Sequence, residues 1–196
     1  MRVLGAILAG GQARRFGSDK ALATLGGKTL IDRVAAALAG QVDAVVICGR
    51  AGGLPDRPRA GLGPLGGLNA ALHEGAARGF DAVLSVPCDT SRLPTDLLDR
   101  LRRAGDRAYI KDAPVVGLWR CALAPTLDSH IVGDDRSLRA WARRVEAIAV
   151  SLDVPIENIN TPADLARLVN EEDRPRRLDV ADARSDSGIG IERRAP

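Results

Sequence analysis

The sequence lacks the features that mark membrane-spanning, secreted and disulfide-stabilised proteins. None of its apolar runs approaches the roughly 18 residues that a membrane-spanning helix needs, and its N-terminus does not have the plan of a signal peptide. Its cysteines, Cys48, Cys88 and Cys121, lie far apart without a C-x-x-C pair, which argues against a zinc site and a disulfide framework. We therefore expect a cytoplasmic protein with reduced thiols.

Aromatic residues and lysines are both scarce. Aromatic residues make up 3% of the chain, so alanine, valine and leucine must build the core, as they do where helices pack closely on a sheet. The net charge is only +3, and the dispersed basic residues have no aromatic neighbours that could stack on bases, which argues against nucleic acid as a partner. Only three of the 28 basic residues are lysines, Lys20, Lys28 and Lys111, so each is a candidate for a place that arginine cannot fill.

The order of the apolar segments predicts an α/β fold. Continuous apolar strands are expected over 3–8, 44–48 and 82–86, and segments with helical spacing separate them over 30–38 and 63–78. Strands that are apolar throughout and alternate with helices are typical of a parallel sheet covered on both sides. We predict a Rossmann-like three-layer fold, with a mainly parallel sheet and helices on both faces.

The second half of the chain is less regular. Strands are expected near 115–119 and 147–152, and helices near 122–129 and 137–144. Pro94 stands where the first residue of a further helix would fall, and Asn160-Thr161-Pro162 should cap the last one. We predict one domain over 1–170 and a polar, mobile tail over 171–196, because Arg, Asp, Ser and Pro dominate there.

A glycine-rich segment after the first strand carries the strongest chemical signal. Leu8-Ala9-Gly10-Gly11 ends the strand, and Arg15 and Lys20 follow. Adjacent glycines let backbone N–H groups approach phosphate oxygens, and the two cations suit a triphosphate. The spacing differs from the P-loop, since Ala21 follows Lys20, and from the G-x-G-x-x-G of dinucleotide-binding proteins.

This segment resembles the L-A-G-G-x-x-x-R-x-G-x-D-K signature of nucleotidyltransferases. Further stretches are similar, in the same order, to those of molybdenum cofactor guanylyltransferases, and they lie at 26–30, 63–67, 86–90, 115–119 and 158–165. The resemblance covers residues 1 to about 170. It implies transfer of GMP from GTP to the molybdenum cofactor, Mo-molybdopterin, with Mg²⁺ as the cofactor and pyrophosphate as the second product. It also implies contact with proteins of molybdenum insertion and molybdoenzyme maturation.

The resemblance also assigns roles to individual residues. The residues that would line the nucleotide are Leu8, Ala9, Gly10, Gly11, Lys20, Cys48, Asp56 and Asp89. Arg15, Lys20 and Asp89 would act in catalysis, with Asp89 as the metal ligand. Asp56 corresponds to an aspartate that contacts guanosine. Cys48 is a departure, because relatives often carry asparagine there and this chain lacks its side-chain amide.

Without the resemblance, several of these residues have ordinary structural interpretations. Asp89 could equally be a turn or N-cap residue, and Asp56 a polar residue of a proline-rich loop. Asn160 could serve the metal, the acceptor or the cap of the last helix. Two alternative functions stay open, a related nucleotidyltransferase that uses CTP or a sugar phosphate, and a non-catalytic nucleotide-binding protein. Lys20 and Asp89 argue against the second.

Overall fold

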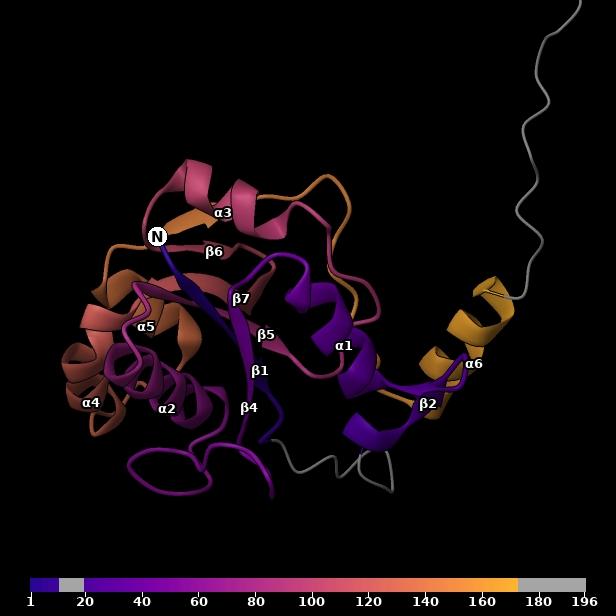
Figure 1. Cartoon of the computed structure of the whole chain (residues 1–196), viewed down its shortest axis with the longest axis horizontal. Coiled ribbons are helices and arrows are strands. Elements are labelled where there is room, and N and C mark those ends of the chain that lie inside the picture. The colour runs from indigo at the N-terminus through magenta and orange to yellow at the C-terminus, as the bar shows by residue number, and fades with distance from the viewer. Residues whose placement is uncertain (11–19, 173–196) are drawn as a thin grey trace, which may run out of the picture.

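A six-stranded sheet forms the centre of the protein. The computed structural model describes residues 1–10 and 20–172, so Gly11, Arg15 and most of the predicted tail lie outside the described residues. The strands follow the order β4-β1-β5-β7-β6-β8 (Figure 1). Their bounds are β1 Val3–Leu8, β4 Ala44–Cys48, β5 Ala82–Pro87, β6 Ala108–Ile110, β7 Ala113–Arg120 and β8 Ile148–Val150. In this sheet only β7 runs antiparallel to its neighbours, so the prediction of a mainly parallel sheet is confirmed.

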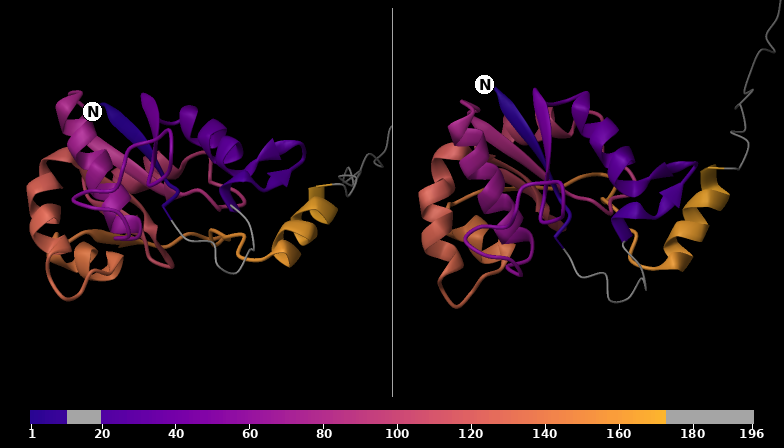
Figure 2. Two further views of the ribbon diagram at one scale, coloured as in Figure 1. Left: turned by 90° about the horizontal axis from the view of Figure 1, so that it is seen from below. Right: turned by 60° about the horizontal axis from the view of Figure 1, so that its bottom comes forward.

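Helices cover both faces of this sheet, as the two further views in Figure 2 make clear. One face carries α1 (Leu30–Ala39) and α3 (Leu97–Ala104), and the other carries α2 (Pro64–Ala77), α4 (Ala124–Ile131) and α5 (Leu138–Arg144). The short helices η1 (Lys20–Leu22) and η2 (Cys121–Leu123) join these elements. The three predicted layers are therefore present.

A small extension lies beside the sheet. The hairpin of β2 (Thr24–Leu25) and β3 (Lys28–Thr29) packs against α6 (Pro162–Glu172). Their contact is a separate apolar cluster of Leu25, Leu30, Ile159 and Leu168. Within the described residues, no helix is both long and apolar enough to cross a membrane.

The apolar character of β1 follows from its place in the sheet. Every residue of this strand is buried. Leu4, Ala6 and Leu8 pack on the side of α2, while Val3 and Ile7 pack on the side of α1. Because successive side chains of a strand point to opposite faces, a strand covered on both sides must be apolar throughout.

The start of α3 corrects one prediction. Pro94 does not begin this helix, which starts at Leu97. Gln41, just after α1, is the reason: its side-chain amide donates to the Pro94 carbonyl at 3.0 Å, and its Oε1 accepts from the Leu98 N–H at 3.1 Å. A residue distant in sequence thus satisfies a helix N-terminus that has no cap of its own.

The cap of α6 separates the roles of two polar residues. Thr161 Oγ1 accepts from the Asp164 N–H at 3.1 Å, and Asp164 Oδ2 accepts from the N–H groups of Asn160 and Thr161 at 2.9 Å each. These bonds hold the pKa of Asp164 below its usual range, and the bond from the Asn160 N–H has the largest effect. This reciprocal arrangement is a capping box in which Thr161 supplies the capping side chain. The Asn160 side chain is therefore not the N-cap.

The stretch 115–119 belongs to the core. Trp119 on β7 is fully buried, and its Nε1–H donates to Ser85 Oγ at 3.0 Å. The Ser85 hydroxyl in turn donates to the Val115 carbonyl at 2.7 Å. Gly117 lies under the indole, where an added Cβ would come within 2.5 Å of a ring carbon of Trp119. The glycine of this stretch thus makes room for its tryptophan.

We predict that Gly117→Ala destabilises the protein by about 1–3 kcal/mol, because overpacking must displace a buried ring that also donates a hydrogen bond. Gly40→Ala is the matched control, since Gly40 has a φ of −76° and nothing lies within 4 Å of an added Cβ. Urea unfolding of the two variants measures the difference. Equal free energies of unfolding would contradict this account of Trp119.

Candidate functional site

The carboxyl ends of β4, β1 and β5 form one edge of the sheet. Leu8, the last residue of β1, pairs with Cys48 on β4 and with Pro87 on β5. The pairing continues past the strand, because the Ala9 N–H donates to the Cys48 carbonyl at 2.9 Å. The residues that follow the three strands therefore emerge side by side, at the edge where open parallel sheets bind their ligands.

Asp56 lies at this edge, within a cradle of glycines. A Cβ added to Gly10, Gly49 or Gly67 would lie 3.4, 3.0 or 3.7 Å, respectively, from Asp56 Oδ1. A Cβ added to Gly66 would lie 3.0 Å from the carboxyl carbon of Asp56. These glycines follow β1, follow β4 and open α2. Three segments that are distant in sequence thus bring bare backbone around one carboxylate.

Gly49 is the position that most requires glycine. Its φ is +83°, and an added Cβ would come within 2.5 Å of the Gly10 Cα. The turn after β4 is fixed by two hydrogen bonds of 2.8 Å, from the Gly49 N–H to the Leu54 carbonyl and from the Leu54 N–H to the Ile47 carbonyl. This turn positions the loop that carries Asp56.

The Asp56 carboxylate is held in an unfavourable state. Its Oδ1 is buried and has no hydrogen-bond partner among the described residues. Burial raises the pKa of this carboxyl, although a hydrogen bond from the Gly61 backbone acts in the opposite direction. A buried acceptor without a donor costs free energy in the folded protein. Such an atom is suited to receive a donor from a ligand.

Cys48 supports the cradle from below. It is fully buried, and an added Cβ at Gly67 would lie 3.2 Å from the Cys48 Cβ. Burial, with a smaller effect of Asp56, raises the pKa of its thiol to about 12, so the thiol is neutral and unreactive. The Cys48 backbone helps to fix this edge of the sheet, because its carbonyl accepts the hydrogen bond from the Ala9 N–H.

Asp89 follows β5 at the same edge. Its carbonyl accepts from the Ile159 N–H at 2.8 Å, and the Ser91 N–H donates to the Glu157 carbonyl at 3.0 Å. Buried Thr90 pairs with Asn158 between these two bonds. The segment before α6 is thereby fixed beside Asp89, which brings the stretch 158–160 to the edge.

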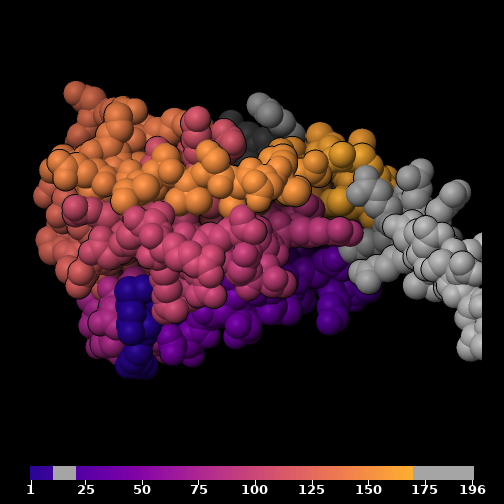
Figure 3. Space-filling model, turned by 90° about the horizontal axis from the view of Figure 1, so that it is seen from above, coloured from indigo at the N-terminus to yellow at the C-terminus, as the bar shows by residue number. Residues whose placement is uncertain are grey.

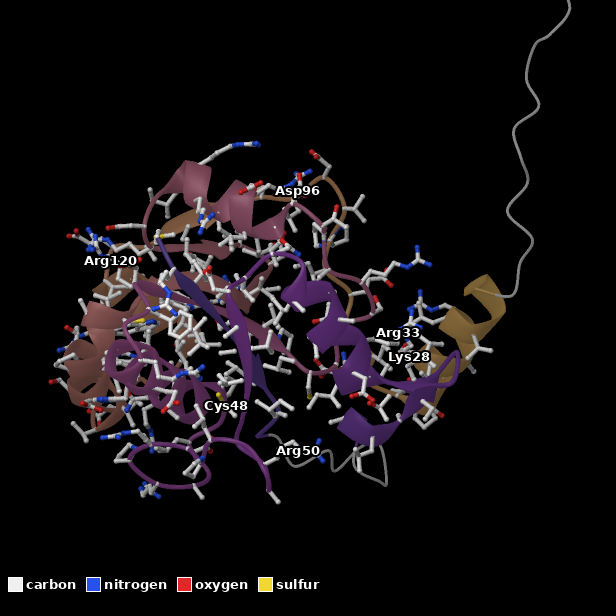
Figure 4. All side chains as sticks on the ribbon, viewed as in Figure 1. Lys28, Arg33, Cys48, Arg50, Asp96 and Arg120 are labelled. Atoms are coloured by element: carbon white, nitrogen blue, oxygen red, sulfur yellow. The ribbon has the colours of Figure 1, made fainter. Side chains whose placement is uncertain are left out.

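The remaining predicted residues are placed only in part. The backbone of Lys20 opens η1 (Lys20–Leu22), while Gly11 and Arg15 belong to the segment outside the described residues. Arg50 is an addition that the sequence reasoning missed. It is half-buried directly after Gly49, and Figure 4 labels it beyond the end of β4. A cation immediately after a strand-end glycine is the signal that could have found it.

The carboxylate of Asp89 is the candidate metal ligand at this edge. The described residues contain no group of three or more His, Cys, Asp or Glu side chains that could hold a metal ion by themselves. Magnesium commonly binds through one or two carboxylates, with water and substrate phosphates completing its shell. A single carboxylate, that of Asp89, fits this kind of site.

The sequence matches a known family over most of its length. Residues 5–149 match the model of the MobA-like NTP transferase domain. The chain belongs to the MobA-like NTP transferase family. A molybdenum cofactor guanylyltransferase of Rhodobacter capsulatus is 43% identical to this transferase over 192 residues, which cover 90% of the chain and 98% of that relative.

Solved structures share the fold of this transferase. The molybdopterin-guanine dinucleotide biosynthesis protein A of Archaeoglobus fulgidus superposes with a TM-score of 0.61 at 21% identity, covering 86% of the chain and 97% of that protein. A Mycobacterium tuberculosis protein in complex with manganese superposes with a TM-score of 0.58 at 14% identity, covering 87% and 99%. At these identities the likeness concerns the fold.

We predict that Asp56→Asn stabilises the unliganded transferase at neutral pH. Because the pKa of Asp56 is raised in the folded state, its contribution to stability is fully present below the unfolded pKa and is lost as the pH rises through the folded pKa. Removing the charge should therefore raise the Tm at pH 7, by about 1–3 °C. The difference from wild type should shrink towards pH 4.

Thermal unfolding across this pH range measures the effect. Asp112→Asn, at an exposed turn, controls for the loss of one negative charge. A lower Tm for Asp56→Asn at pH 7 would mean that the folded protein supplies Asp56 Oδ1 with a donor after all.

Proposed function

We propose that this protein transfers GMP from GTP to Mo-molybdopterin, forming molybdopterin guanine dinucleotide and pyrophosphate. The Rhodobacter capsulatus relative, which this chain matches over 98% of that protein's length, carries the name molybdenum cofactor guanylyltransferase. The single observation that carries the proposal is the buried Asp56 Oδ1 without a partner, at the edge where the nucleotide must lie.

The chemistry of Asp56 favours guanine over the other bases. Guanine presents two adjacent donors, N1–H and the 2-amino group, and an ionised carboxylate can accept from both. Adenine and cytosine each pair an amino group with a ring nitrogen that accepts, so a carboxylate would face one repulsive contact. The orphaned oxygen of Asp56 therefore supports GTP over CTP and ATP.

The phosphates would lie along the glycine-rich segment. Backbone N–H groups near Gly10 and Gly11, with the side chains of Arg15 and Lys20, would neutralise the triphosphate as the resemblance implies. Arg50 adds a cation at the neighbouring strand end. The lysine suits a narrow place between phosphate oxygens, because an ammonium is a compact point charge.

Mg²⁺ would be held by Asp89, together with phosphate oxygens and water. When bound, it would stabilise negative charge on the oxygens of the α- and β-phosphates. Asp89 supplies the fixed protein ligand, because hydrogen bonds on both sides of Thr90 anchor its backbone.

The transfer step needs positioning more than proton transfer. An oxygen of the acceptor's terminal phosphate attacks the α-phosphorus, a new P–O bond forms, and the bond from the α-phosphorus to the bridging oxygen breaks. Pyrophosphate leaves with that electron pair. The attacking phosphate is already anionic at neutral pH, so alignment and charge neutralisation carry the catalysis.

The test is pyrophosphate release with Mo-molybdopterin and Mg²⁺, using GTP, ITP, CTP and ATP in parallel. Wild type should prefer GTP, and ITP should be poorer because it lacks the 2-amino donor. We predict that Asp56→Asn raises the KM for GTP at least about tenfold, equivalent to roughly 1.4 kcal/mol, and raises the KM for ITP less.

Two outcomes would change this assignment. An equal loss for GTP, ITP and CTP would move Asp56 from the base to the ribose. Wild-type preference for CTP, or turnover with a sugar phosphate in place of Mo-molybdopterin, would favour the related nucleotidyltransferases instead.

We also predict that Asp89→Ala lowers kcat by about 10²–10³-fold or more, because it removes the carboxylate proposed to hold the metal ion. Its Tm should stay within about 3 °C of wild type, since only side-chain atoms beyond Cβ are lost and the anchoring bonds are made by the backbone. Asp112→Ala serves as the control. Near-normal turnover of Asp89→Ala at saturating Mg²⁺ would remove Asp89 from the metal site.

A further inference from the structure

A cavity opens two residues along the chain from Asp89, at Ser91. It is a cavity of about 470 Å³ between residues 91–94, which follow β5, and residues 152–157, which follow β8. Arg100 of α3 and Leu168 of α6 also line it. Figure 3 shows this face, where the chain that includes α3 (magenta) lies against the chain that follows β8 (orange). The volume is in the range of small-molecule sites.

The cavity belongs to the same edge of the sheet as Asp89. β5 and β8 run in the same direction. β7 is antiparallel to both β5 and β6, so β5 and β6 share a direction, and β8 pairs parallel to β6. Both lining segments therefore leave the sheet at its carboxyl edge. The proposed nucleotide site lies at the ends of β4, β1 and β5. The cavity lies towards the other half of the sheet, which consists of β7, β6 and β8.

A short ladder joins the cavity to Asp89. Hydrogen bonds between Asp89 and Ile159, and between Ser91 and Glu157, pair the two segments over three residues. Ser91 and Glu157 line the cavity, while Asp89 stands at the other end of the ladder. Two residues of extended chain span about 6.6 Å. The cavity thus begins within the length of a small ligand from the metal carboxylate.

The lining combines apolar walls with charges of both signs. The walls come from leucine, isoleucine, valine and proline side chains, and the charged residues are Arg92, Arg100, Asp153 and Glu157. Arg100 is engaged by Asp96 at 2.9 Å and Asp153 at 3.6 Å, and Glu157 by Arg167 at 3.6 Å. Exposed Arg92 has no ion-pair partner within the described parts of the chain.

We propose that this cavity holds the pterin ring system of the acceptor, an inference that rests on the proposed function. The acceptor carries its phosphate at one end and a flat ring system at the other. With its phosphate at the α-phosphorus near Asp89, the acceptor would place its rings in this cavity, which begins at Ser91, two residues further along the ladder. Apolar walls can stack on the rings, while carboxylates and guanidinium groups match N–H donors and the carbonyl of a 2-amino-4-oxo pyrimidine edge.

The test separates acceptor binding from nucleotide binding. The double variant Arg92→Glu/Val154→Trp reverses one charge and adds bulk at the cavity, and both residues are exposed, so the fold should persist. The matched control is Arg139→Glu/Val132→Trp on α5 and after α4, on the opposite side of the sheet. Val154 and Val132 are 76% and 79% exposed, which makes the two tryptophan substitutions comparable.

Binding of Mo-molybdopterin is measured by anaerobic equilibrium dialysis without nucleotide, with the pterin quantified after oxidation to a fluorescent product. GTP binding is measured separately by calorimetry. The double variant should bind Mo-molybdopterin at least tenfold more weakly and GTP within twofold of wild type, and the control should match wild type in both. In turnover, the KM for the acceptor should rise while the KM for GTP stays within twofold.

Two different results would overturn the proposals separately. If wild type turns over GTP and Mo-molybdopterin but the double variant binds the acceptor within twofold of wild type, the cavity assignment is wrong and the proposed function stands. If wild type neither binds Mo-molybdopterin nor releases pyrophosphate with it, the proposed function fails, and the pterin assignment fails with it.

Discussion

The close approach of bare backbone around Asp56 is the constraint on which the site depends. Gly10 after β1 and Gly49 after β4 pack so tightly that a Cβ on Gly49 would come within 2.5 Å of the Gly10 Cα. Gly66 and Gly67 bring the first turn of α2 against the same carboxylate. The sheet register fixes the first two glycines, and the packing of α2 on β1 and β4 fixes the others. The surroundings of this one carboxylate thus depend on β1, β4 and α2 together.

This arrangement lowers the stability of the folded protein. An isolated buried acceptor is among the more costly features a small domain can retain, and burial of Asp56 raises the pKa of its carboxyl accordingly. The segments around it are joined to the core through Leu65, Leu68 and Cys48, which are fully buried in one apolar cluster. The contrast with Asp164 is informative, because that carboxylate accepts bonds from its own helix cap and the pKa is lowered instead.

Local patterns in the sequence predicted the strands that are apolar throughout and the helix cap that is made by neighbouring residues. β1 is apolar throughout because both faces of the sheet are covered, and Thr161 caps α6 through residues next to it in sequence. The predictions were wrong or incomplete where residues distant in sequence determine the bounds of an element, or where an element is very short. Gln41 moves the start of α3 beyond Pro94, and the short strands β2, β3 and β6 have too few residues for a period to be visible. Asp56 could be selected from a resemblance, but its burial among four glycines requires the fold.

The strand order divides the carboxyl edge of the sheet into two halves on either side of β5. β5 occupies the middle of the sheet, with β1 and β4 on one side and β7, β6 and β8 on the other. Asp89, at the end of β5, therefore stands at the only strand end that borders both the glycine cradle and the 470 Å³ cavity among the described residues. A reaction between two phosphates requires their charges to meet at one point, and under the proposed mechanism Asp89 would hold the metal ion at that boundary. Because β7 runs antiparallel to β5 and β6, the carboxyl ends of β5, β6 and β8 lie at the same edge, where Asp89 and the lining of the cavity are both found.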